Sequence, residues 1–574
     1  MIFNFRQAVA IATISVFASA VADAASRNSS NVLQYVPVDT PYIIASTEPP
    51  PKKLAEKLEP TIDQVLQAYQ TVLRHVMAEQ LAKLSEDEAS ANEAARVRGV
   101  FEEFIGLMSI DALRDAGIDR ESAMALYGNG IIPVLRFELT DEEAFDDMVE
   151  QFEEKAETPL SSGEARGESY KFAAVGTAKI VIATLDEQAV ITIIPTSFDE
   201  AKIAQSIGID KPRKNLARSK TLRAIGKEYG FSEYMTGYID SLRIAEILTG
   251  QGSDFDRELF AMTDSELPEL DEQCRIEVME MAGIAPRMVF GYSEMSTDLV
   301  ESSMIIELRE DIADGLAAIP TAVPGLGSDP GGFVSFGVGM NLLKLREFYE
   351  ARLDAMEASP YECELFADLQ ESTVKGREAL SQPIPPVVYS FRGFVANIID
   401  VNGLDMGSNT PPESIDASIL LAIENAESLI AMGAMMDPQI AALNLVPDGK
   451  PVKLDLPQLA ELADQAFAAL SANSVSVSIG EGAENNSAEM LVAKSVSPAP
   501  FLSMSMDSAR YYAMIGDAMA NEQVDDEGAA MPDAVREALR DVMRLSGSIY
   551  ERMNLDVRFT GRGVEIDGRM HLSD

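Results

Sequence analysis

The chain has 574 residues, and its 93 Asp and Glu against 46 Lys and Arg give a formal net charge of −47. A surface this acidic repels nucleic acid and anionic membranes, so the composition excludes a general nucleic-acid-binding or membrane-surface protein. A chain of this length can bury a large core and form more than one domain.

Residues 1–24 have the pattern of a signal peptide. Arg6 precedes a short apolar run over residues 8–22, and Ala22-Asp23-Ala24 is typical of a cleavage site. The run is short for a retained membrane span, and no cysteine lies near the cleavage site to carry a lipid anchor. We therefore expect an exported bacterial protein, periplasmic or secreted, with no integral membrane segment after cleavage.

Two elements precede the central part of the first half. Apolar residues keep helical spacing from Leu58 to Val76, which predicts a long amphipathic helix. Gly128-Asn129-Gly130 separates two apolar runs and predicts a tight hairpin, because Asn-Gly accepts positive φ.

Residues 133–152 have the pattern of a strand, a polar stop and a helix. Residues 134–139 alternate in polarity, as in a strand with one buried face. Thr140 has a hydroxyl that can cap a helix, and Glu143, three residues later, completes a capping box. An apolar stripe at helical spacing follows, formed by Phe145, Met148, Val149 and Phe152.

The same order of strand, polar stop and helix recurs along the chain. The later stop residues are Asp240, Asn341, Asn425 and Asp507. Two interpretations stay open: a true structural repeat with a long period, or the several strand-to-helix turns that any α+β protein contains.

One stretch is basic in an otherwise acidic chain. Its cations include Lys211, Arg213, Lys214, Arg218, Lys220 and Arg223. Such a cluster can bind an anionic group or an acidic partner. The alternative is that these cations neutralise nearby carboxylates within the fold, since charge runs are usually solvated faces.

The chain has two cysteines, Cys274 and Cys363. In an oxidising compartment each has only the other as a partner within the chain, which predicts one disulfide that closes a long loop. The alternative is two buried free thiols.

The segment 321–332, TAVPGLGSDPGG, is rich in Gly and Pro and predicts a linker. It separates an N-terminal half, residues 25–320, from a C-terminal half, residues 333–574. In the second half we expect hairpins at 475–493 and 555–572. Because helices alternate with hairpins, the sequence predicts an α+β fold, with antiparallel sheets built of recurring strand–helix–hairpin units, helices packed on one face, and two related halves.

The residues that usually carry chemistry are sparse. The only histidines are His75 and His571, and neither a phosphate-binding loop nor a dinucleotide fingerprint is present. The stretch from Asp400 to Asp405 resembles part of a calcium loop but lacks its glycine position and distal glutamate, so a solvated turn is the better interpretation. We assign no catalytic residue, no metal ligand and no cofactor.

Two stretches resemble a family of exported bacterial proteins that is catalogued as a domain of unknown function. They are Val36-Pro-Val-Asp-Thr-Pro-Tyr42 and residues 125–136, ALYGNGIIPVLR. The resemblance implies an exported α+β protein and no particular activity.

Taken together, these patterns favour a non-enzymatic binding or envelope-structural protein, with an envelope protein as its partner. The alternative is a hydrolase of envelope material that uses carboxylates in a cleft between the two halves. Cation binding is a third hypothesis.

Overall fold

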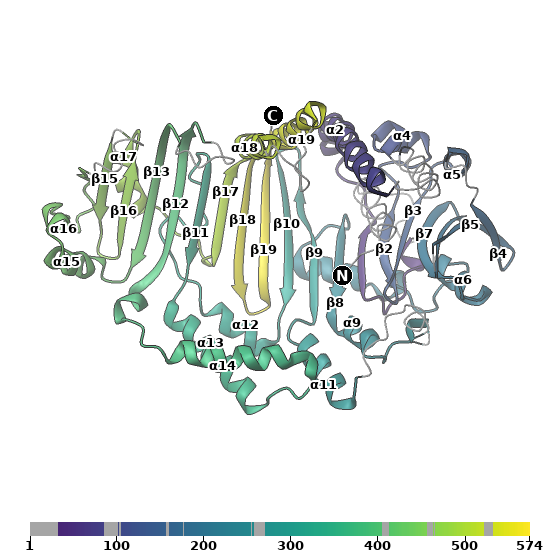
Figure 1. Cartoon of the computed structure of the whole chain (residues 1–574), viewed down its shortest axis with the longest axis horizontal. Coiled ribbons are helices and arrows are strands. Elements are labelled where there is room, and N and C mark those ends of the chain that lie inside the picture. The colour runs from purple at the N-terminus through teal and green to yellow at the C-terminus, as the bar shows by residue number, and fades with distance from the viewer. Residues whose placement is uncertain are drawn as a thin grey trace. The chain divides into compact units, whose positions relative to one another are not determined.

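We describe the protein from a computed structural model, which defines residues 32–84, 102, 105–155, 160–175, 177–253, 255–257, 270–404, 412–455, 463, 465–521 and 532–573. The chain forms two compact units (Figure 1). Unit 1 draws on the ranges Met1–Asp271, Val278–Ser302 and Gln523–Ile549, and unit 2 on Glu272–Glu277, Ser303–Glu522 and Tyr550–Asp574. The expected signal peptide lies outside the described residues. Within these residues, no helix is long and apolar enough to cross a membrane.

Unit 1 is built on an antiparallel sheet. Its strands pair in the order β9-β8-β1-β2-β3-β7-β6-β5-β4. The strands are β1 Tyr42–Ser46, β2 Met124–Asn129, β3 Ile132–Glu138, β4 Ser161–Ala165, β5 Glu168–Val175, β6 Ala178–Leu185, β7 Gln188–Pro195, β8 Thr236–Asp240 and β9 Arg287–Met295. The predicted hairpin is confirmed as β2–β3, although Asn129 is the last residue of β2 and pairs with Ile132.

Helices cover both faces of this sheet, so the expectation of helices on one face is wrong for unit 1. Leu135 and Phe137 of β3 pack with Phe145 and Val149 of α5 in one buried cluster. Arg136 lies between them in the strand and therefore points to the opposite face, where it bonds the end of α6. The helices are η1 Val32–Gln34, α2 Lys52–Leu84, α4 Ile110–Asp115, α5 Glu142–Lys155, α6 Glu200–Ile207, α7 Leu216–Ser219, α8 Thr221–Tyr229, α9 Ser241–Leu248 and α19 Asp533–Ile549.

The cap of α5 differs from the predicted one. The side chain of Asp141 accepts from the backbone N–H of Ala144 at 3.1 Å. The Thr140 hydroxyl donates instead to the carbonyl of Gly117 at 3.0 Å, because the chain turns into the helix one residue later than expected. At the other stops, Asp240, Asn341 and Asp507 cap their helices as predicted, whereas Asn425 makes no side-chain cap bond.

Unit 2 also has an antiparallel sheet, with the order β19-β18-β17-β11-β12-β13-β16-β15-β14. The strands are β11 Val334–Gly339, β12 Phe391–Asn402, β13 Ser414–Ile423, β14 Val452–Lys453, β15 Ala466–Leu470, β16 Ser474–Ile479, β17 Leu502–Asp507, β18 Tyr550–Thr560 and β19 Gly563–Leu572. The hairpin expected at 555–572 is confirmed as β18–β19. The hairpin expected at 475–493 is wrong, because Gly480 and Gly482 end β16 in positive φ and α17 follows.

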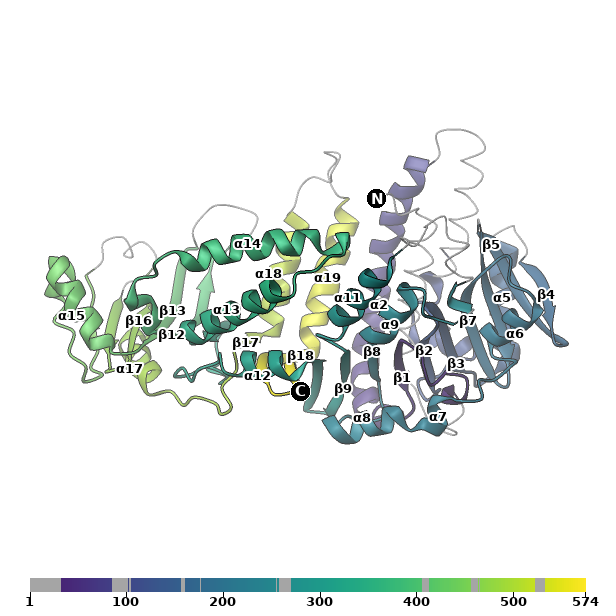
Figure 2. The same cartoon turned by 90° about the horizontal axis from the view of Figure 1, so that it is seen from below.

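The sheet of unit 2 is covered unequally. Leu420 and Ala422 of β13 are buried with Met490 of α17, and Figure 2 shows α17 on one side of the sheet and α14 on the other. On the α14 side, Ile419 and Leu555 are 39% and 38% exposed. The helices are α12 Glu310–Ala317, α13 Leu342–Ala358, α14 Ala367–Ser381, α15 Ala426–Met436, α16 Pro438–Ala442, α17 Ala483–Val492 and α18 Ser508–Asn521, with 3₁₀ turns η2 Glu364–Phe366 and η3 Pro386–Ser390.

The units do not coincide with the expected halves. The chain passes between them within α11, Glu272–Ala282, and within β10, Leu299–Glu307, and α19 belongs to unit 1. The Gly/Pro segment 321–332 therefore lies inside unit 2, where Val323 and Leu326 are buried against Val395 and Leu420. Local composition could not reveal this, because a Gly/Pro-rich segment can also pack as a tight core loop.

Candidate binding site in unit 1

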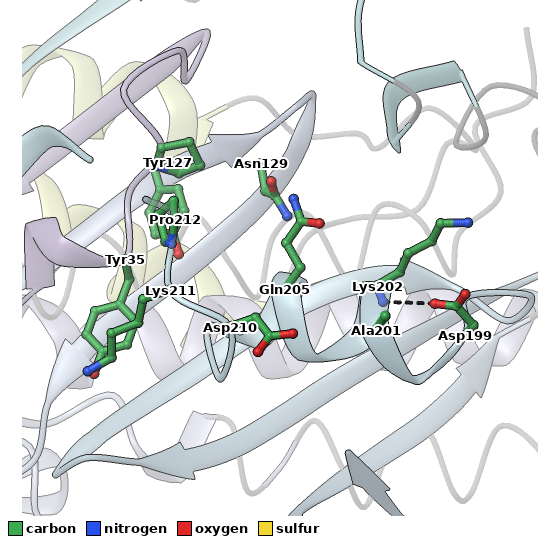
Figure 3. A pocket seen from close by; sticks show the side chains of 11 residues that line it. Tyr35, Tyr127, Asn129, Asp199, Ala201, Lys202, Gln205, Asp210, Lys211 and Pro212 are labelled. Carbon is green, nitrogen blue, oxygen red and sulfur yellow. Dashed lines mark hydrogen bonds between the residues drawn. The ribbon is translucent and has the colours of Figure 1, made fainter. Parts of the chain in front are cut away.

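A pocket of about 390 Å³ lies in unit 1 (Figure 3). Tyr35 follows η1, Tyr127 and Asn129 come from β2, Gln205 comes from α6, and Lys211 lies in the loop before α7. The volume is within the range of sites for small molecules or for a few residues of a peptide.

A fully buried cation supports this region. The Arg136 side chain has no exposed surface, and its guanidinium donates to Gln188 Oε1 at 3.0 Å and to the carbonyl of Ile207. The guanidinium carbon lies 3.7 Å from the centre of the Tyr35 ring, a cation–π contact. Among the described residues, Arg136 forms no salt bridge and its Nε–H has no acceptor. Burial lowers its pKa.

Gly208 makes room for that guanidinium. It ends α6 in a left-handed conformation, with φ +86°, and an added Cβ would lie 2.4 Å from Nη2 of Arg136. Glycine is therefore required here both by the backbone and by the close approach of the arginine.

Tyr35 links the buried arginine to a polar cluster at the surface. Its hydroxyl donates to Asp186 at 2.6 Å, and the Lys211 ammonium donates to the same carboxylate at 2.9 Å. These two hydrogen bonds lower the pKa of Asp186 below its usual value. Burial opposes the charged form of Lys211, but its bonds with Tyr35 and Asp186 outweigh that effect and raise its pKa.

We expect the Asp186→Asn variant to be less stable than the native protein at pH 7, by under about 1 kcal/mol because the ion pair is largely exposed. A lowered carboxyl pKa stabilises the fold above the unfolded-state value of about 3.9, and that stabilisation is lost as the pH falls through the folded-state pKa. Denaturant midpoints of the two proteins should therefore converge as the pH falls below about 4. A difference that does not change with pH would contradict this role of Asp186.

The pocket also contains two side-chain amides that point toward each other in Figure 3, those of Asn129 and Gln205. Asn129 is only 7% exposed, and its amide makes no hydrogen bond with any described residue. The amide of Gln205 likewise lacks a partner among the described residues, although Gln205 is exposed.

The predicted basic residues begin at the pocket wall. Lys211 lines the pocket, and the following segment is held by the backbone bonds Val38 N–H to Lys214 O and Leu216 N–H to Val36 O. The Asn215 side chain caps α7, and Lys220 adopts the left-handed conformation, with φ 59°, between α7 and α8. The segment is therefore a fixed part of unit 1.

The basic residues differ in their ion pairs. Lys211 pairs with Asp186, and Arg223 pairs with Glu233 at 3.3 Å. The other four predicted cations are exposed, and none has a carboxylate within salt-bridge distance among the described residues: Arg213, Lys214, Arg218 and Lys220. Arg218 lies close to Arg213, since its Nη1 donates to the Arg213 carbonyl at 3.4 Å.

The predicted cysteine pair lies in unit 2. The sulfurs of Cys274 and Cys363 are 2.07 Å apart, a bonding distance, so the structure joins them in a disulfide. Beside them, the Glu277 carboxylate is buried and accepts from the backbone N–H groups of Glu362 and Cys363, each at 2.9 Å. This arrangement fixes the start of α11 to the segment before η2.

The remaining sequence candidates do not form a site among the described residues. His75 lies in α2 and His571 in β19. Asp400 pairs with Arg510, Asn402 donates to Asp400, and Asp405 lies outside the described residues. Within the described part of the chain, no three His, Cys, Asp or Glu residues are grouped so that they could hold a metal ion.

The chain was compared with known proteins. No protein-family model matches it, and no curated protein sequence is similar enough to count as a relative.

The sequence pattern predicts the basic residues but not the roles of Tyr35, Arg136 and the two amides. Arg136 occupies a polar position in an alternating strand, which predicts an exposed side chain. The weak signal was an arginine between two buried apolar residues close to a glycine-rich hairpin.

Proposed function

We propose that this protein is an exported, periplasmic or secreted, non-enzymatic binding protein, and that the basic segment of unit 1, residues 211–223, binds an acidic partner in the cell envelope. The observation that carries the proposal is that four exposed cations of this segment have no carboxylate partner among the described residues, in a chain with a net charge of −47. If the segment only neutralised nearby carboxylates within the fold, most of its cations would form salt bridges with Asp or Glu.

The surrounding charge gives this segment selectivity. At physiological ionic strength, charges beyond about 8 Å are largely screened, so a partner that touches the segment experiences mainly its local positive charge. The rest of the acidic surface repels long polyanions, which cannot contact the segment alone. A short acidic surface on another protein can touch the basic segment without also lying against the acidic surface around it.

Replacing Arg213, Lys214 and Arg218 with Glu is expected to abolish partner capture in living cells and to leave the denaturant midpoint unchanged, because these side chains are exposed and form no salt bridge. The control makes the same charge change at Lys344, Lys375 and Lys494, which are exposed residues of unit 2. Because Lys344 pairs with Glu347 and Lys375 with Glu371, the control should lose a little stability but keep partner capture. Crosslinking followed by mass identification compares the three proteins. Unchanged capture together with lost stability would refute the proposal.

We also propose that the two units are copies of one structural repeat. Support comes from the pairing order, which is the same and antiparallel throughout when strands are matched as β9/β18, β8/β17, β1/β11, β2/β12, β3/β13, β7/β16, β6/β15 and β5/β14. The likeness lies in topology rather than in residue identity. The polar stop after β3, β11, β13, β8 and β17 is part of this shared pattern.

The hydrolase hypothesis stays a prediction. No observation in either unit selects a pair of carboxylates for it.

A further inference from the structure

We propose that the partner segment is an acidic peptide in extended form, and that the pocket beside the basic segment holds one of its backbone amides through Asn129 and Gln205. This inference rests on the proposed function, because it assigns the chemistry of the partner that the basic segment would bind.

The amide of Asn129 is the observation that points to a ligand. A side-chain amide has two donor hydrogens and an acceptor oxygen, so an amide that faces a pocket without a protein partner can bond a ligand there. Asn129 is 7% exposed, lines the pocket and has no partner among the described residues. Gln205 presents a second amide opposite it (Figure 3). Two facing amides offer a donor and an acceptor, which complement the C=O and N–H of a peptide group.

The charged groups that line the pocket favour a neutral group inside it, because two of them are carboxylates and the lysine is already paired with Asp186. The Asp199 carboxylate accepts from the Lys202 backbone N–H at 2.9 Å, and Asp210 pairs with Arg166 at 3.5 Å. Lys211 is held by Asp186 at 2.9 Å. A carboxylate or phosphate in the pocket would lie near the carboxylates of Asp199 and Asp210, which repel it, whereas a backbone amide carries no net charge.

The pocket and the exposed cations are continuous along the chain. Pro37 and Pro212 line the pocket, and Pro37 also bridges to Asn215. Arg213 and Lys214 follow Pro212 directly, so their Cα atoms lie within about 8 Å of that wall. An extended peptide advances about 3.3 Å per residue, so acidic side chains a few residues from the bound amide reach these cations.

These features favour a peptide over other polyanions. Sulfated polysaccharides, nucleic acids and anionic lipid surfaces present charge but no peptide group for the facing amides. They also extend over the acidic surface that surrounds the segment.

The test measures the binding of three fluorescent probes to the full mature protein by anisotropy: acetylated hexaglutamate amide, the same peptide with every backbone nitrogen methylated, and acetylated hexaglutamine amide. Heparin and vesicles of anionic lipid are then measured as competitors of hexaglutamate. We expect hexaglutamate to bind at least tenfold more tightly than either of the other peptides. Asn129→Ala and Gln205→Ala should each weaken hexaglutamate binding by about tenfold, the effect of one lost hydrogen bond near the upper end of its range. Gln205 is exposed, so its replacement tests the pocket even if Asn129→Ala fails to fold. Gln382→Ala, at an exposed site in unit 2, is the control and should change nothing.

Three results would overturn the inference. Equal binding of the methylated peptide would exclude amide recognition, and tighter binding of heparin or of vesicles with anionic lipids would exclude a peptide as the ligand class. If hexaglutamate does not bind, while cellular capture is still lost in the Arg213, Lys214 and Arg218 reversal, the inference fails and the proposed function stands. If that reversal leaves capture intact, the proposed function itself fails.

Discussion

Replacing Arg136 with alanine is expected to destabilise unit 1 by about 3 to 5 kcal/mol. The guanidinium is fully buried, and its loss leaves Gln188 Oε1 and the Ile207 carbonyl without their donor. Each orphaned buried acceptor costs about 1 to 3 kcal/mol, and the cavity under Tyr35 adds to that cost. Denaturant unfolding followed by tyrosine fluorescence measures the change.

The matched control is Arg166→Ala in the same unit. Arg166 is 51% exposed and pairs with Asp210 at 3.5 Å, so its loss should cost under about 1 kcal/mol. Arg136→Lys retains a positive charge, but a lysine cannot reach both acceptors. We expect the stability of this variant to lie between those of the native protein and Arg136→Ala. If Arg136→Ala is no less stable than Arg166→Ala, the buried arginine does not support the pocket.

Replacing both Cys274 and Cys363 with serine is expected to destabilise unit 2 by about 4 to 5 kcal/mol. The disulfide joins residues that are 89 positions apart, and a loop of that length loses much conformational freedom in the unfolded chain when it is closed. The measurement is the denaturant midpoint of the native protein and of the double variant.

Reductant provides the control for the disulfide. It should lower the midpoint of the native protein toward that of the double serine variant and leave the variant itself unchanged. Equal midpoints for the native and variant proteins under oxidising conditions would show that the cross-link does not stabilise unit 2.

Much of the local structure could be predicted from the sequence, because periodicity and capping act over short distances. The strand and helix around Thr140, the long helix through Leu58 and the hairpin ending at Leu572 all appear as expected. Asp141 rather than Thr140 caps the helix, because the threonine hydroxyl donates to the carbonyl of Gly117 instead. Such a competition depends on residues distant in the sequence.

The assembly of the units could not be predicted, because strand pairing is non-local. β1 pairs with β8, nearly two hundred residues later, and the Gly/Pro segment at 321–332 forms part of a core. The candidate site likewise combines residues that local sequence predicts with residues that only the fold brings together. The cations at 211–223 are close in sequence, so composition alone predicts them, whereas Tyr35, Asn129, Arg136 and Gln205 come together only through the fold.

The central claim is that the basic segment of unit 1 is the binding face, and photo-crosslinking in living cells tests it most directly. A benzoyl-phenylalanine is placed at position 213 in one protein and at position 551, an exposed site in unit 2, in another. We expect one recurrent envelope protein to be crosslinked from position 213, to be absent from position 551, and to be lost when Lys214 and Arg218 are replaced by Glu. No reproducible adduct from position 213, or the same adducts from both positions, would contradict it.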